Sequence, residues 1–243
     1  MRIKCGISGA RMALLPYAIE VLDALVECFT PIDIALSSYG IREGLLYEQM
    51  SKKLRKKDPL IEACAFAEMK DARAPGFGLQ LFKFVLPLFP TADDEAARLI
   101  KAACHLHDVS WRGHPDYRAE ICFDNATRAN LGGLKHAERV FLGLSLMHRY
   151  RNQRKGHKFE NLFSLLSQEQ MRMAEILGKA MRLGAMMWVN KEETNAKLFW
   201  APDAKALQLV LEGDAVSLYG EVAEARLKSL ARAMNASFAF QAK

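Results

Sequence analysis

Apolar residues recur at helical spacing through most of the chain. Between Leu14 and Phe29 they return every three or four residues, with Pro16 where a first helical turn would tolerate it. After Pro59 the same spacing predicts seven helices, the third of them preceded by a capping-box pattern of Thr91 and Asp94. Their expected bounds are residues 60–72, 76–89, 92–107, 115–128, 135–150, 159–165 and 168–188. The pattern therefore predicts a mainly α-helical protein.

Two regions have the period of a β-strand instead. Residues 32–38 form an apolar run between Pro31 and Gly40, which predicts one short buried strand. After Asn190, two alternating segments flank a turn at Pro202-Asp203, and a helix over 216–234 separates them from a third segment at 237–240. We expect a small β-β-α-β unit at the C-terminal end.

A change in composition divides the chain. Residues 51–59 are rich in lysine and arginine and end in proline, as expected of a solvated helix end and linker. The single strand at 32–38 needs partner strands, so the N-terminal segment is expected to be part of a larger, sheet-containing domain. The expected domains are residues 1–50, 58–190 and 191–243.

Composition and charge limit the class of protein. The chain has 243 residues and a formal net charge of +6, which favours an acidic partner such as nucleotide or polyphosphate. Its five cysteines are scattered, without the close pairs that signal zinc or redox chemistry. No stretch of eighteen apolar residues occurs, so no membrane segment is predicted. A cytoplasmic protein with reduced thiols is expected.

The candidate polyanion-binding residues are cations between the fifth helix and the segment after it. A line of cations gains affinity for a polyanion by releasing counterions, so such binding should weaken with salt. The candidates are Lys135, Arg139, Arg149, Arg151, Arg154, Lys155 and Lys158. The alternative is that these are ordinary exposed cations. Aromatic residues are not interleaved with them, and no zinc finger or RNA-binding signature is present, so nucleic acid is not the expected ligand.

The adjacent pair His107-Asp108 is a candidate metal site. An imidazole and a carboxylate at a helix end suit a divalent metal that activates water. His105 cannot join His107 on one ion, because residues two apart on a helix point about 200° apart. The preceding helix, which starts near Gly76, offers no further histidine. The alternative is a structural role in capping the helix or holding a loop, and no complete set of catalytic residues is present.

Four segments resemble the exopolyphosphatase/guanosine pentaphosphate phosphohydrolase family. The most specific is the motif of residues 37–47, with Gly40, Arg42, Glu43 and Gly44 at its centre. The others are residues 11–16, 105–118 and 130–139. The resemblance implies an HD-like helical domain with a small C-terminal α+β unit, preceded by a helix-strand remnant of an actin-like lobe.

The resemblance also implies a function. Family enzymes remove terminal phosphate from polyphosphate or guanosine pentaphosphate, with Mg²⁺ held by an actin-like half that this chain does not match. This region would contribute polyanion binding and homodimerisation, with no cofactor of its own and little activity alone. Two alternatives remain open: a stand-alone HD-type metal-dependent phosphohydrolase, and a nucleic-acid-binding helical module. The sequence does not decide between polyphosphate and guanosine pentaphosphate.

Overall fold

A computed structural model describes residues 6–34, 37, 39–152, 156, 158–187 and 195–243. The chain divides into two compact units, residues 1–56 and residues 57–243. The division falls inside the charged segment of residues 51–59.

The first unit contains three helices and no buried residue in its described part. They are α2 (Gly9–Phe29), α3 (Ile41–Gln49) and α4 (Lys52–Arg55). The Ser8 hydroxyl caps α2 by accepting from the Arg11 backbone N–H at 3.4 Å. Because α2 begins before Leu14, Pro16 lies inside the helix rather than in its first turn, which corrects the expectation. Residues 32–34 and 37 are not a strand, also against expectation, whereas residues 35, 36 and 38 lie outside the described part.

The missing strand has a physical reason. A strand is stable only when a neighbour accepts and donates its backbone hydrogen bonds. The three strands that the described residues form all lie in the second unit and pair with one another. The actin-like origin of the first unit therefore stays a prediction from the resemblance.

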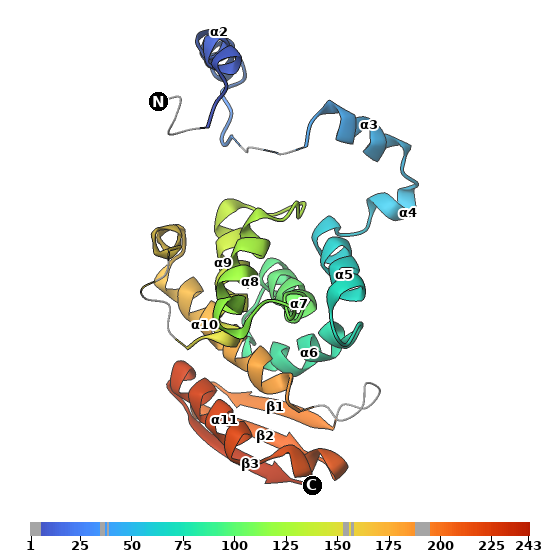
Figure 1. Cartoon of the computed structure of the whole chain (residues 1–243), viewed down its shortest axis with the longest axis vertical. Coiled ribbons are helices and arrows are strands. Elements are labelled where there is room, and N and C mark those ends of the chain that lie inside the picture. The colour runs from blue at the N-terminus through green and yellow to red at the C-terminus, as the bar shows by residue number, and fades with distance from the viewer. Residues whose placement is uncertain (1–5, 35–36, 38, 153–155, 157, 188–194) are drawn as a thin grey trace. The chain divides into compact units, whose positions relative to one another are not determined.

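The second unit confirms the predicted series of helices (Figure 1). Pro87 lies where α6 gives way to a short 3₁₀ helix, and the sixth predicted helix is also 3₁₀. Asp93 caps α7 by accepting from the Ala96 N–H at 2.8 Å, so Thr91 does not cap it. The elements are α5 (Pro59–Asp71), α6 (Phe77–Val85), η1 (Leu86–Leu88), α7 (Asp94–Leu106), α8 (Pro115–Arg128), α9 (His136–Tyr150), η2 (Glu160–Leu165) and α10 (Gln168–Gly184).

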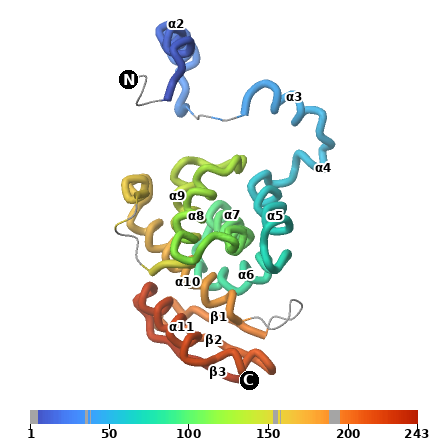
Figure 2. Tube along the Cα trace, in the orientation of Figure 1, coloured from blue at the N-terminus to red at the C-terminus, as the bar shows by residue number. Residues whose placement is uncertain are grey.

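Helix α10 is central to the second unit. It packs against α9, α11 and α6, and its buried side chains include Met171, Leu177 and Met181. Figure 2 traces the chain from α5 through these helices to the strands. In that view, α10 lies on the side of the helices that faces the strands, so it connects the helical part to the sheet.

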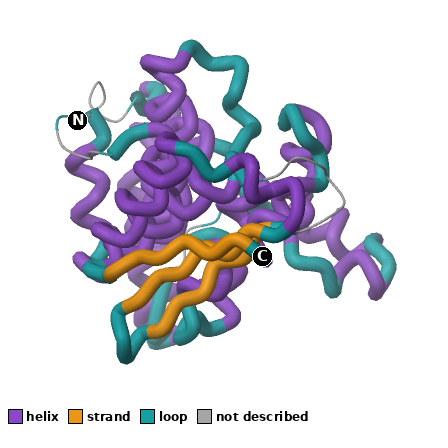
Figure 3. The backbone as a smooth tube through the Cα atoms, turned by 90° about the horizontal axis from the view of Figure 1, so that it is seen from below, coloured by secondary structure: helices purple, strands orange, loops and turns teal. Residues whose placement is uncertain are grey.

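The C-terminal β-β-α-β unit is confirmed. Strands β1 (Ala196–Ala201) and β2 (Ala206–Leu211) are antiparallel, and β3 (Ser237–Ala242) pairs with β2 in parallel. Between β2 and β3 lie η3 (Gly213–Leu218) and the crossover helix α11 (Glu221–Met234). At the hairpin turn, the Lys205 N–H donates to the Pro202 carbonyl at 3.1 Å. Figure 3 shows the three strands side by side, with helices behind them.

One hydrophobic core joins the helices and the sheet. It runs from Leu60 through Leu177 to Leu209 and Leu227, so residues 58–190 and 191–243 share a single compact unit. Cys64, Cys104 and Cys122 are buried free thiols, whereas Cys28 is exposed. Within the described residues, no helix is long and apolar enough to cross a membrane.

Candidate functional site

The carboxylate of Asp108 lies at the end of α7, between two arginines. Arg73, in the loop after α5, donates its Nε to Asp108 Oδ2 at 2.8 Å and its Nη2 to Oδ1 at 2.6 Å. Arg149 of α9 places Nη2 3.6 Å from the same Oδ1. Burial alone would raise the pKa of Asp108, but the hydrogen bonds of Arg73 and the charge of Arg149 outweigh burial and lower it. Asp108 is therefore an ionised, ion-paired carboxylate.

His107 is the C-cap residue of α7, next to Asp108, and its side chain is neutral. Its Nδ1 is 2.8 Å from the Cys104 carbonyl, which can only accept, so Nδ1 carries the proton. Burial, aided by the charge of Arg149, lowers the pKa of His107 to about 4. The Tyr150 hydroxyl donates to the His107 carbonyl at 3.1 Å. His107 thus links α7 to α9 without a charge of its own at neutral pH.

These residues do not suit a divalent metal. Both carboxylate oxygens of Asp108 already accept hydrogen bonds from Arg73, so guanidinium charge occupies the position where a cation would bind. Across the described residues, no group of three His, Cys, Asp or Glu side chains is placed to hold an ion. The geometry favours the structural alternative for His107 and Asp108 over the metal site.

His105 belongs to a second buried pair. Its Nδ1 is 2.5 Å from Oε2 of Glu68 on α5, whose other oxygen accepts from the Gly78 N–H at 2.6 Å. A Cβ at Gly78 would lie 2.8 Å from the His105 Cα and 2.9 Å from the same Glu68 Oε2. Only glycine fits this contact of α5, α6 and α7, and the pair holds the three helices together.

Most of the predicted polyanion-binding cations are engaged by the protein. Arg139 donates to the Ala129 and Leu131 carbonyls at 2.8 and 2.6 Å. Arg151 donates to the Asp116 carbonyl at 2.9 Å. Lys158 Nζ is 3.2 Å from the Asp124 carboxylate, and Arg149 is buried beside Asp108. Lys135 is exposed at the start of α9, whereas Arg154 and Lys155 lie outside the described residues.

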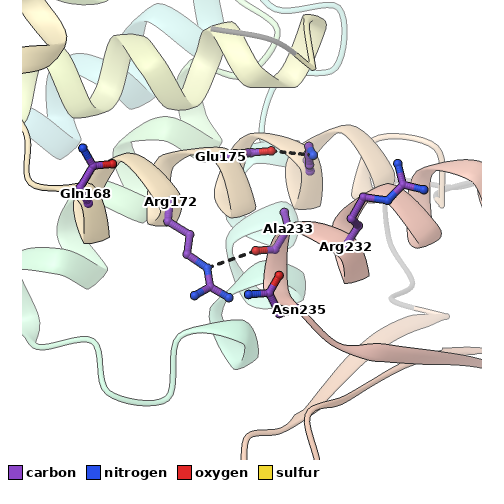
Figure 4. Close-up of a pocket in the computed structure, with 7 residues that line it drawn as sticks. Gln168, Arg172, Glu175, Arg232, Ala233 and Asn235 are labelled. Carbon is purple, nitrogen blue, oxygen red and sulfur yellow. Dashed lines mark hydrogen bonds and ion pairs between the residues drawn. The ribbon is translucent and has the colours of Figure 1, made fainter.

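A different basic surface lies between α10 and α11. A groove of about 470 Å³ separates the two helices, and Figure 4 shows Arg172 and Arg232 toward its opposite ends. We call it the α10–α11 groove; its lining residues are Gln168, Arg172, Glu175, Lys179, Arg232, Ala233 and Asn235. Three cations and one carboxylate line it, so its net charge is positive.

Two of these cations also fix the helices. Arg172 Nε donates to the Ala233 carbonyl at 3.2 Å, and Lys179 Nζ lies 3.4 Å from the Ser229 carbonyl. Lys179 is paired as well with Glu175 at 2.7 Å. The carbonyls are neutral, so the charge of Arg172 is left without a carboxylate among the described residues. Its remaining guanidinium N–H groups are available to a ligand in the groove.

The motif of residues 40–44 forms the start of α3 in the first unit. Gly40 is the N-cap residue, and its N–H donates to Glu43 Oε2 at 2.7 Å. That hydrogen bond lowers the pKa of Glu43. Arg42 and Gly44 are exposed in the same helix. The motif therefore has a helix-capping role in this unit.

The comparison with protein families matches residues 60–240 to the family described as exopolyphosphatase, C-terminal. The chain belongs to this family. A search of curated proteins finds no match to the chain. The exopolyphosphatase C-terminal match covers nearly all of the second unit, and the motif at Gly40–Gly44 precedes it.

Within this exopolyphosphatase C-terminal unit, the α10–α11 groove was not anticipated from the sequence. A partial signal exists, because Arg172, Lys179 and Arg182 are spaced by seven and three residues and so share one face of α10. Helix spacing cannot say which element covers that face, and the pairing with α11 supplies Arg232 from sixty residues away.

Proposed function

We propose that this chain is the substrate-holding and assembly part of an exopolyphosphatase-type hydrolase, which removes terminal phosphate from polyphosphate or guanosine pentaphosphate. The family match supports the hydrolase class. The observation that carries the binding role is the excess of cations along the α10–α11 groove. A polyphosphate chain is anionic at every unit, so a groove with unneutralised cations would attract it and concentrate it near the enzyme.

The groove supports binding better than the contiguous basic segment does. Arg139 and Arg151 use their N–H groups on backbone carbonyls, and Lys158 is paired with Asp124. Arg172 and Arg232, by contrast, are exposed cations with no carboxylate partner among the described residues. Lys135 and the segment around Arg154 and Lys155 could extend this surface, and they remain part of the proposal.

We propose that the residues lining the α10–α11 groove hold the polyphosphate substrate and do not cleave it. Hydrolysis needs a group that activates water and a second group that stabilises the negative charge developing on the phosphate in the transition state. Asp108 is neutralised by Arg73 and Arg149, and the described residues offer no three-donor metal set. Mg²⁺ would serve the full-length enzyme through its actin-like half. A stand-alone HD-type metal hydrolase is the less favoured alternative for the same reasons.

We further propose that the helical unit forms a homodimer. Phe66 and Met69 are exposed on α5 and lie about one turn apart, so they form an apolar surface that a second copy could cover. Sedimentation velocity should show a dimer for the wild-type chain. It should show a monomer for Phe66→Ser/Met69→Ser, because both side chains are solvent-exposed and their replacement leaves the core intact. A wild-type monomer, or a variant that stays dimeric, would contradict this surface.

The binding proposal is tested with long-chain polyphosphate at several salt concentrations, with Mg²⁺ present and phosphate release followed in the same tubes. Wild-type chain should bind, lose affinity steeply with salt, and release no phosphate. Arg172→Gln/Arg232→Gln should weaken binding about tenfold or more, since each charged contact contributes roughly 1.5 kcal/mol or more.

The matched control removes the same charge elsewhere. Lys70 and Lys83 are exposed on α5 and α6, outside the groove, so Lys70→Gln/Lys83→Gln should bind as the wild type does. Equal weakening in both variants would mean that only net charge matters, and the groove would be rejected. RNA of matched charge is the competing ligand, and its tighter binding would favour the nucleic-acid alternative.

A further inference from the structure

Helix α10 packs against α9 and also against α11. Gly178 of α10 packs directly on α9, where an added Cβ would lie 2.5 Å from the His148 Cβ and 2.9 Å from the Arg149 backbone nitrogen. Because glycine has no side chain, the backbones of α9 and α10 approach each other closely beside Arg149. Arg182 follows Gly178 by one helical turn, so it lies on the same face of α10, next to this contact.

The contacts between α10 and α11 place a second arginine there. Arg172 reaches the Ala233 carbonyl, and Lys179 reaches the Ser229 carbonyl, so the two helices run antiparallel. One turn further along this register, Arg182 of α10 lies opposite Arg226 of α11. We call Arg149, Arg182 and Arg226 the three-arginine junction.

The three arginines of this junction have one carboxylate between them among the described residues, that of Asp108, which also pairs with Arg73. Arg182 and Arg226 are half-buried and have no carboxylate partner there. Arg149 is 7% exposed, shares Asp108 with Arg73, and has a buried Nε–H with no acceptor. Burial, followed by the charges of Arg226 and Arg149, lowers the pKa of Arg182. An unsatisfied buried donor and clustered like charges both destabilise the folded protein in the absence of a ligand.

We propose that the three-arginine junction binds one tetrahedral phosphate group, either free inorganic phosphate or one phosphoryl unit of a polyphosphate chain. Guanidinium groups present forked N–H donors that match phosphate oxygens, and the half-buried setting strengthens charge-assisted hydrogen bonds. Bound phosphate would accept from Arg149 Nε and neutralise Arg182 and Arg226. If the bound phosphate is a unit of polyphosphate, this proposal rests on the proposed function. If it is free inorganic phosphate, this proposal does not depend on the proposed function.

Thermal unfolding of the full chain, with and without inorganic phosphate at matched ionic strength, tests the site. Wild-type Tm should rise with phosphate concentration, because a ligand that binds only the folded state stabilises it. Arg182→Gln should have a higher Tm than the wild type in phosphate-free buffer, because like-charge repulsion is relieved. It should bind phosphate about tenfold or more weakly by calorimetry.

Arg226→Gln should behave in the same way, and Lys83→Gln, exposed on α6 outside both the groove and the junction, should keep the phosphate response of the wild type. A wild-type Tm that does not change with phosphate concentration would overturn the proposal. So would an Arg182→Gln variant that keeps the full response. A Tm of Arg182→Gln below that of the wild type in phosphate-free buffer would also overturn the proposal, because the arginine would then stabilise the folded protein.

Polyphosphate binding separates the two proposals. If free phosphate competes with polyphosphate and Arg182→Gln weakens both, one phosphoryl unit of the chain occupies the junction. If phosphate binds there without competing, the ligand is free phosphate. Polyphosphate binding without any phosphate response rejects the junction alone. A phosphate response without polyphosphate binding rejects the proposed function and retains the junction.

Discussion

Replacement of Asp108 by asparagine should destabilise the second unit strongly. The change keeps the shape of the side chain and removes the negative charge that Arg73 and Arg149 share. The Asp108 side chain is 5% exposed and that of Arg149 is 8% exposed, so the guanidinium of Arg149 would be left buried without an anion. Breaking a buried ion pair at one partner costs about 3–5 kcal/mol.

The lower end of that range is the better expectation. The Arg73 side chain is 55% exposed, so water would solvate it after the change and its share of the loss would be small. A loss of about 3 kcal/mol in a unit of this size corresponds to a fall in Tm of about 6–12 °C. Asp116→Asn is the control, because that side chain is 79% exposed and its loss should move Tm by about 2 °C or less.

Calorimetry with and without divalent metal distinguishes the ion pair from a metal site. Under the ion-pair interpretation, Asp108→Asn lowers Tm equally in chelator and in Mn²⁺. An Asp108→Asn variant that unfolds at the wild-type temperature would contradict the ion pair. So would a wild-type Tm that rises with Mn²⁺ while that of the variant stays unchanged, since Asp108 would then be a metal ligand.

Two further predictions concern packing and pH. Gly178→Ala should lower Tm by about 2–12 °C, because its Cβ would meet α9 at 2.5 Å and overpacking costs about 1–3 kcal/mol, whereas Gly220→Ala, with open space around it, should change Tm little. The lowered pKa of His107, about 4 against 6.5 when unfolded, means that the unfolded chain binds the extra proton as pH falls. Stability should therefore drop between pH 6.5 and pH 4, by up to about 3 kcal/mol, and urea unfolding of His107→Gln should show a shallower drop over this range.

The sequence predicted the second unit well because its helices have clear apolar stripes. Leu106 and its neighbours on α7 repeat at the period that buries one face, and that period is local information. The strand predicted at residues 32–38 was wrong for residues 32–34 and 37, because a strand depends on partner strands that an apolar run in the sequence does not reveal. Helix starts depended on single capping side chains, and Asp93 rather than Thr91 caps α7.

The candidate sites were harder to predict because their contacts are remote in sequence. The pair His107-Asp108 was visible, but the partner that decides its chemistry, Arg73, is 35 residues from Asp108. The cations between Lys135 and Lys158 were visible too, but the sequence does not show that Arg139 and Arg151 donate to backbone carbonyls. The α10–α11 groove required the register of two helices, which periodicity alone does not supply.

Arginine has two distinct roles in this unit, and its partners separate them. Arg73 pairs with the buried carboxylate of Asp108, and Arg149 shares that carboxylate, so these ion pairs stabilise the fold. Arg172 donates to a neutral carbonyl, and Arg182 has no carboxylate partner among the described residues, while the charges of Arg226 and Arg149 help to lower its pKa. Those contacts leave positive charge at a half-buried surface, which costs stability unless an anion binds. The same residue type thus stabilises the protein at the end of α7 and, between α10 and α11, favours a phosphate ligand.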